Sequence, residues 1–181
     1  MIDEIMEYNR KFVENKGYEP YLTSKYPDKK LAILTCMDTR LLELLPAALG
    51  IKNGDAKIIK NAGGVIVHPY GSVVRSLLVA ILELGVEQVM VIGHTDCGVQ
   101  GMDGSEMLDM LVERGIDQQH IDIVRHSGID LERWLGGFES VESSVHETVR
   151  RLKEHPLMPK DVRISGFIMD SATGELTRVE A

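Results

Sequence analysis

Two stretches of the chain decide its fold: LAILTCMDTR (residues 31–40) and VMVIGHTDCG (residues 89–98). Each begins with an apolar run typical of a buried strand and then changes to polar residues that include a cysteine. The first stretch contains Cys36, and the second contains His94 and Cys97. Two thiolates and an imidazole are ligands for zinc, and a set of three leaves the fourth position free, as in catalytic rather than structural zinc sites. The two stretches can share such an ion only if the fold brings them together.

Strand and helix patterns alternate along most of the chain. Apolar runs predict strands at residues 31–35, 56–60, 88–92 and 162–169. Helical periodicity predicts intervening helices at residues 40–48, 73–84 and 141–152. A last short strand at 175–179 is expected to pair antiparallel with the strand before it. This alternation predicts an α/β fold of three layers, in which helices flank a mainly parallel sheet of about five strands, ordered 2-1-3-4 with the antiparallel strand at the edge.

This strand order brings the two stretches to one point. Strands one and three are neighbours whose crossovers leave to opposite faces, and open α/β sheets bind ligands at the carboxyl ends of such strands. Cys36 follows strand one, whereas His94 and Cys97 follow strand three, so the three side chains are expected to meet. A Cys36–Cys97 disulfide is the alternative, but it is transient in a reducing cytosol and leaves His94 unexplained.

Asp38 and Arg40 extend the first motif. They follow Cys36 at i+2 and i+4, a spacing that puts the three side chains on one side while the backbone stays extended. The arginine would keep the carboxylate ionised and oriented through bidentate hydrogen bonds. Asp38 then has two roles open to it: it can accept a hydrogen bond from zinc-bound hydroxide, or it can swing in as the fourth ligand and close the site. Taken alone, Asp-x-Arg is more often a solvated salt bridge at a strand end.

Glycines near the two motifs are the candidate pocket residues. The loop NAGG (61–64) lacks both the G-x-G-x-x-G pattern and the P-loop lysine, which argues against a phosphate cradle. We expect Gly63 and Gly64 instead to let the backbone approach the crevice. Gly93 and Gly98 flank the second motif and are predicted to form the tight turn around the ligands.

Composition and charge exclude several classes of protein. A net charge of −8 argues against nucleic acid or an anionic membrane as the partner. The chain has no signal-peptide pattern and no apolar run near the roughly 20 residues that span a bilayer, so we expect a cytoplasmic protein. Its 181 residues suit one domain, 1–181, in which residues 1–30 are an arm with an amphipathic helix at 2–15.

The chain resembles the β-class carbonic anhydrases, in particular their smaller archaeal and Gram-positive members. The similarity runs over nearly the whole length and includes CMDTR (36–40), KNAGG (60–64), GHTDCG (93–98) and SGFIMDSATGEL (165–176). It implies one zinc ion per chain on Cys36, His94 and Cys97, an Asp38–Arg40 dyad, and reversible hydration of carbon dioxide to bicarbonate by zinc-bound hydroxide. It also implies a homodimer, or a higher even oligomer, in which the N-terminal arm packs on the partner.

Two alternatives to this function remain at the level of sequence. Related proteins with the same ligands hydrolyse carbon disulfide or carbonyl sulfide, and access to the zinc rather than the ligand set decides the substrate. Such differences are expected in residues 99–138, a polar segment for which the sequence predicts only short helical pieces. A non-catalytic zinc protein that Asp38 closes is the second alternative. His68 is a candidate proton shuttle, although an ordinary loop histidine is the more common case.

Overall fold

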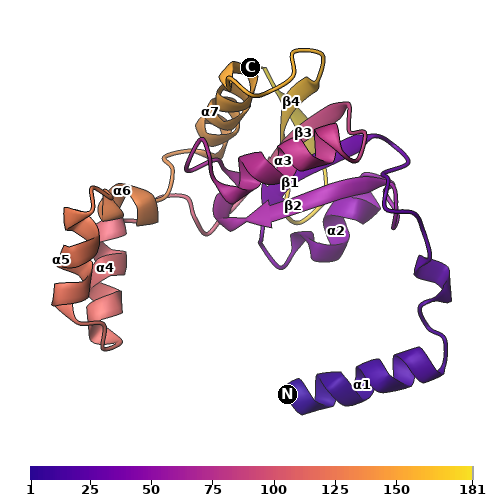
Figure 1. Cartoon of the computed structure of the whole chain (residues 1–181), viewed down its shortest axis with the longest axis horizontal. Coiled ribbons are helices and arrows are strands. Elements are labelled where there is room, and N and C mark those ends of the chain that lie inside the picture. Colours follow the sequence, from indigo (N-terminus) through magenta and orange to yellow (C-terminus); the bar gives the residue numbers. More distant parts are fainter. Residues whose placement is uncertain (181) are drawn as a thin grey trace.

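The computed structural model describes residues 1–180 and is built on one five-stranded sheet (Figure 1). The strands are β1 (Leu31–Cys36), β2 (Ala56–Asn61), β3 (Gln88–His94), β4 (Arg163–Met169) and β5 (Leu176–Val179). Their spatial order is β2-β1-β3-β4-β5, with parallel pairing up to β4 and antiparallel pairing of β5 on β4. This order and the antiparallel edge strand confirm the fold predicted from the sequence.

Helices flank both faces of the sheet, and others stand apart from it (Figure 1). They are α1 (Ile2–Glu14), α2 (Leu41–Ala48), α3 (Ser72–Leu82), α4 (Gly104–Glu113), α5 (Gln118–His126), α6 (Leu131–Leu135) and α7 (Val141–Glu154), with short 3₁₀ turns η1 (Glu19–Tyr21) and η2 (Ala62–Gly64). No helix within residues 1–180 has the length and apolar character needed to cross a membrane.

The alternation of side chains along β1 divides the core into two layers. Ala32 and Leu34 are fully buried in the cluster that contains α3 and α7, whereas Ile33 is fully buried in the cluster that contains Leu41 and Leu45 of α2. A parallel strand that is covered on both faces has to be apolar throughout, and this is why the LAIL run carries no polar residue. The carboxyl ends of β1 and β3 are thereby fixed side by side.

Gly93 and Gly166 lie in strands of the sheet, and the close packing of a helix on them, rather than a turn, requires glycine at these positions. The prediction that Gly93 belongs to a tight turn is wrong, since Gly93 lies within β3. A Cβ atom there would lie 2.7 Å from Val141 and 2.8 Å from Val145 of α7, and one on Gly166 of β4 would lie 2.7 Å from the same Val145. Glycine therefore allows α7 to pack closely on β3 and β4.

The segment between β3 and α7 forms a separate small lobe of three helices, α4, α5 and α6 (Figure 1). Its own core consists of Leu108, Ile121 and Leu131. The chain enters and leaves the lobe at one place, where Gln100 forms a bridge with Phe138. Backbone hydrogen bonds close this junction, from Gly101 N–H to Phe138 O at 2.9 Å and from Gly137 N–H to Met102 O at 2.9 Å.

The N-terminal helix α1 stands apart from the sheet and from the lobe (Figure 1). No residue of this helix is buried. Its apolar side chains remain largely exposed, including Ile5 at 59%, Met6 at 63% and Val13 at 53%. An amphipathic helix of this kind gains most of its stability from packing its apolar face, yet within residues 1–180 most of the apolar face of α1 has no packing partner.

We expect the Glu147→Gln variant to be less stable than the wild type at neutral pH and equally stable in strong acid. Hydrogen bonds from Arg150 and Arg151 lower the pKa of Glu147 from 4.5 to about 2. A carboxyl group with a lowered pKa in the folded state contributes stability above its unfolded pKa, and this contribution disappears as the pH falls through about 2 to 4. Because Glu147 is 39% exposed, the contribution is about 1 kcal/mol or less.

Urea unfolding of the wild type and of Glu147→Gln at several pH values between 7 and 3 measures this difference. A difference in free energy of unfolding that stays constant over this range would contradict the prediction.

Candidate active site

The three predicted ligands lie together at the carboxyl ends of β1 and β3. Thr35 pairs with Ile92 in the register of these strands, which places Cys36 beside the end of β3. One ligand atom each from Cys36, His94 and Cys97 lies within 4.8 Å of the others, and all three residues are buried. The neighbouring strands of the switch point therefore bring the two sequence motifs together, as predicted.

The geometry of this cluster fits a zinc ion. The two Sγ atoms are 3.9 Å apart, close to the separation of about 3.8 Å expected for two sulfurs bound tetrahedrally at about 2.3 Å from zinc. The Nδ1 atom of His94 lies 2.9 Å from the carbonyl oxygen of Thr95, which can only accept, so Nδ1 carries the proton. Nε2 is left with a free lone pair, and it is buried without a hydrogen-bond partner. A metal ion held by the three residues would satisfy this atom.

The cysteines are free thiols in the structure rather than a disulfide. Burial, opposed by a hydrogen bond from the Val99 N–H, raises the pKa of the Cys97 thiol above its ordinary value. A bound cation would reverse this effect, because metal ligation requires the thiolate. These observations favour the metal interpretation over the disulfide alternative.

Asp38 and Arg40 form a bidentate pair beside the ligands. Arg40 donates from Nε to Asp38 Oδ1 at 3.0 Å and from Nη2 to Oδ2 at 2.8 Å, and its backbone N–H also donates to Oδ1 at 2.8 Å. The last bond shows that the chain turns after Asp38, so the extended geometry assumed for residues 36–40 does not continue to Arg40. The Arg40 hydrogen bonds hold the pKa of Asp38 well below its usual range, and Asp38 is therefore ionised. Its Oδ2 lies 3.8 Å from Nε2 of His94.

Asp96 is a site residue that the sequence reasoning missed. Arg40 Nη1 donates to Asp96 Oδ2 at 2.8 Å, and Nη2 donates to the Asp96 backbone carbonyl at 2.7 Å. Hydrogen bonds with Asp38 and then Asp96 raise the pKa of Arg40 further above its usual value. Asp96 also has a left-handed backbone with φ of +53°, which aspartate tolerates better than most residues. No spacing rule connects residues 40 and 96, so only the fold reveals this contact.

The glycine loop, residues 61–64, packs closely against the end of β1 that carries Cys36. Gly63 and Gly64 are buried and have φ of +81° and +65°. A Cβ atom on Gly64 would lie 2.9 Å from the backbone carbon of Thr35 and 3.0 Å from the backbone nitrogen of Cys36, so only glycine lets this loop approach the end of β1. Gly98 differs, because no atom lies within 4 Å of a Cβ built there. Within the second motif, the residue that makes the left-handed turn is Asp96.

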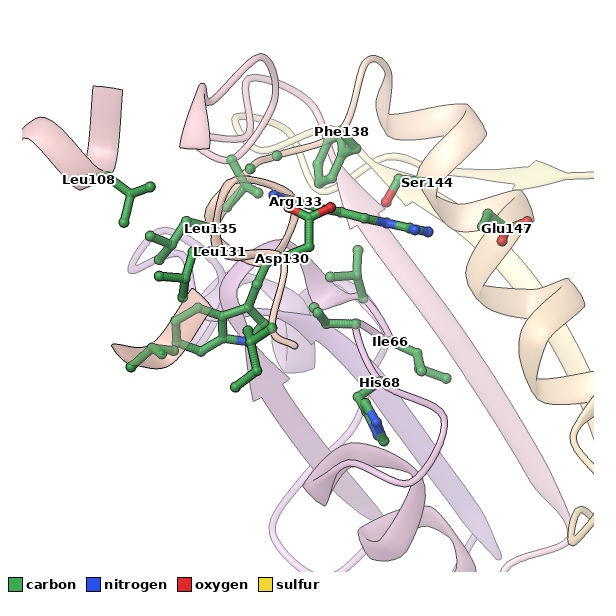
Figure 2. A pocket seen from close by; sticks show the side chains of 18 of the residues that line it. Ile66, His68, Leu108, Asp130, Leu131, Arg133, Leu135, Phe138, Ser144 and Glu147 are labelled. Carbon is green, nitrogen blue, oxygen red and sulfur yellow. Dashed lines mark hydrogen bonds between the residues drawn. The ribbon is translucent and has the colours of Figure 1, made fainter. Parts of the chain in front are cut away.

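An apolar groove lies between the lobe and the body of the protein (Figure 2). It is a cavity of about 1100 Å³, and Figure 2 shows Leu131 and Leu135 of α6, Ile66 and His68 of the segment after β2, and Glu147 of α7 around it. His68 is exposed, and its Nδ1 accepts a hydrogen bond from the Tyr70 N–H at 3.1 Å. Its role as a proton shuttle stays a prediction.

Comparison with known proteins assigns the family. The family model for carbonic anhydrases matches residues 31–176. The chain is 51% identical to YvdA of Bacillus subtilis, a protein provisionally named a carbonic anhydrase, over 97% of this chain and 89% of that one. It is 31% identical to a carbon disulfide hydrolase of Saccharolobus solfataricus, over 83% of this chain and 78% of that one.

The fold comparison agrees with the sequence comparison. The crystal structure of β-carbonic anhydrase isoform I from Trichomonas vaginalis superposes with a TM-score of 0.88 at 34% identity, covering 99% of this chain and 97% of that one. The match to the family model includes both motifs and the strands β1 to β4, and it ends at the first residue of β5. The chain therefore belongs to the β-carbonic anhydrase family of enzymes.

Proposed function

We propose that this enzyme catalyses the zinc-dependent, reversible hydration of carbon dioxide to bicarbonate. The observation that carries the proposal is the buried Cys36–His94–Cys97 cluster, with an ionised carboxylate 3.8 Å from the free ligand nitrogen of His94. Zinc in such a site supplies a bound water that ionises near neutral pH and thus acts as a nucleophile towards carbon dioxide.

The residues of the chain have separate roles in this proposal. Cys36, His94 and Cys97 hold the ion and leave its fourth position free. Asp38 is ionised and so can only accept a hydrogen bond, which would orient a proton donor bound at that fourth position. Arg40 keeps Asp38 ionised and directed away from solvent through the bidentate contact.

Stopped-flow measurement of carbon dioxide hydration tests the proposal. Zinc-replete protein is expected to turn over at neutral or alkaline pH, to lose this activity after treatment with a chelator, and to regain it when zinc is added back. Absence of turnover at both pH values, with about one zinc still bound per chain, would contradict it. That outcome would leave a site closed by Asp38 or a different substrate.

Hydrolysis of carbon disulfide or carbonyl sulfide is the second candidate function. The carbon disulfide hydrolase of S. solfataricus, at 31% identity, supports it. Both substrates are linear molecules with an electrophilic carbon, so the same ligand set suits them. Release of sulfide from either compound, without carbon dioxide hydration by the same preparation, would favour this function.

We also propose that the enzyme is a homodimer in which α1 packs on the partner subunit. The chain has an amphipathic helix that buries none of its residues and an apolar groove of about 1100 Å³ beside the lobe. The helix stands apart from the sheet and the lobe of its own chain (Figure 1), so we assign the groove to α1 of a partner subunit. Both surfaces are apolar, and association would remove them from water.

The Met6→Asp variant is expected to weaken this dimer about tenfold or more, because it places a charge on the apolar face of α1. Sedimentation velocity across a range of protein concentrations measures the effect. Lys11→Gln changes the net charge by the same amount on the opposite face, where Lys11 makes an exposed ion pair with Glu7 at 3.4 Å, and should leave the dimer intact. Equal behaviour of the two variants would rule out α1 as the contact.

A further inference from the structure

Arg40 is held between two aspartates, and only one of them belongs to the dyad. One edge of its guanidinium contacts Asp38 at 2.8 and 3.0 Å. The other contacts Asp96, through the carboxylate at 2.8 Å and through the backbone carbonyl at 2.7 Å. Asp96 is thus bound twice by the same side chain, on the short loop that joins the ligands His94 and Cys97.

The stability of the fold does not explain this contact. The Asp96 side chain is 86% exposed and that of Arg40 is 40% exposed, and ion pairs in such positions contribute little to folding. The contact instead restricts orientation. With Asp96 in place, the guanidinium is fixed at both edges, whereas without it Arg40 keeps only Asp38 and one carbonyl and gains freedom to turn towards solvent.

The freedom of Arg40 matters because of where Asp38 lies. Its Oδ2 is 3.8 Å from His94 Nε2 and is therefore within reach of the point that the three ligand atoms face. Arg40 contributes two of the side-chain hydrogen bonds that hold Asp38 in its present orientation. If the Arg40 side chain had more freedom, the Asp38 carboxylate could move towards the metal position. There it would compete with other ligands for the fourth coordination position.

We propose that Asp96 is a positioning residue, which holds Arg40 on Asp38 and thereby keeps Asp38 off the metal. The proposal rests on the zinc site proposed above but not on the identity of the substrate. It predicts that the fourth position becomes less accessible when the Asp96 side chain is removed, and that this effect depends on the presence of Asp38.

Binding of azide to the zinc-loaded protein, measured by calorimetry, tests the accessibility of the fourth position without any turnover. Asp96→Gly keeps the left-handed backbone of φ +53° without strain, and Asp96→Asn also tolerates it. We expect azide to bind about threefold to tenfold more weakly to Asp96→Gly, in keeping with the small energy of an exposed pair. Asp96→Asn should bind with intermediate strength, since its amide oxygen still accepts from Arg40.

The double variant Asp38→Ala/Asp96→Gly distinguishes a positioning role of Asp96 from a general disturbance of the loop that carries the metal ligands. In an Asp38→Ala background there is no carboxylate to compete, so adding Asp96→Gly should leave azide affinity and zinc content unchanged. Equal weakening in both backgrounds, no weakening in either, or failure of the zinc-loaded wild type to bind azide would each overturn the proposal. Carbon dioxide turnover is measured on the same samples. If it is absent while the azide pattern holds, the proposed function fails and the role of Asp96 stands.

Discussion

Cys97→Ser is expected to remove both zinc binding and carbon dioxide turnover. Serine replaces a thiolate, which zinc prefers, with a hydroxyl that stays protonated at neutral pH. Loss of a residue that only supports a ligand weakens metal binding or activity by about 10–100-fold, so loss of a direct ligand should weaken zinc binding more than a hundredfold. Competition with a chromophoric chelator measures the affinity, and stopped flow measures the turnover.

Cys36→Ser should behave in the same way, because its Sγ lies 3.9 Å from that of Cys97 and faces the same point. Circular dichroism shows whether each variant is still folded. Retention of zinc at the wild-type affinity by either folded variant would mean that the metal binds elsewhere on the chain.

Asp38→Ala is expected to separate turnover from metal binding. Zinc should remain bound, because Cys36, His94 and Cys97 are unchanged. Turnover should fall on the order of a hundredfold or more, because no acceptor orients the group at the fourth position. Metal analysis and stopped flow on the same preparation measure both quantities.

Asp38→Asn provides a matched variant of similar shape. The amide can accept a hydrogen bond through its oxygen, but it carries no charge and presents two donors to Arg40. We expect turnover below that of the wild type here too. Wild-type turnover in both Asp38 variants would show that the dyad has no part in the reaction.

The sheet and the metal cluster were predictable because their signals are local. The apolar LAIL run fits a strand that is covered on both faces, and the structure places Ile33 and Leu34 in opposite core layers. The right-handed crossover rule leaves few strand orders, and in the doubly wound order β1 lies beside β3, which brings Cys36 to His94. Few alternatives survive these constraints, which is why residues far apart in sequence could be assigned to one site.

Other features depend on contacts that no local pattern encodes. The Arg40–Asp96 contact arises only after two loops meet, and the glycine at position 93 reflects the approach of Val141 and Val145 rather than a turn. Residues 99–138 resisted prediction because each lobe helix fully buries only one apolar residue in the core of the lobe. The core of the lobe is formed by one residue from each of its three helices, for example Leu108 of α4 and Leu131 of α6. The apolar periodicity within one helix is a weak signal when the residues that pack against that helix lie on the other two helices.

The junction at Gln100 and Phe138 makes the lobe a removable module of the enzyme. Both ends of the lobe meet at one bridge, so a longer, shorter or different segment can replace it without moving β3 or α7. The metal ligands lie outside this segment and do not line the groove between the lobe and the body of the protein, whereas the lobe forms much of that groove. Exchange of this one segment can therefore reshape the groove, while the residues of the metal site are inherited unchanged.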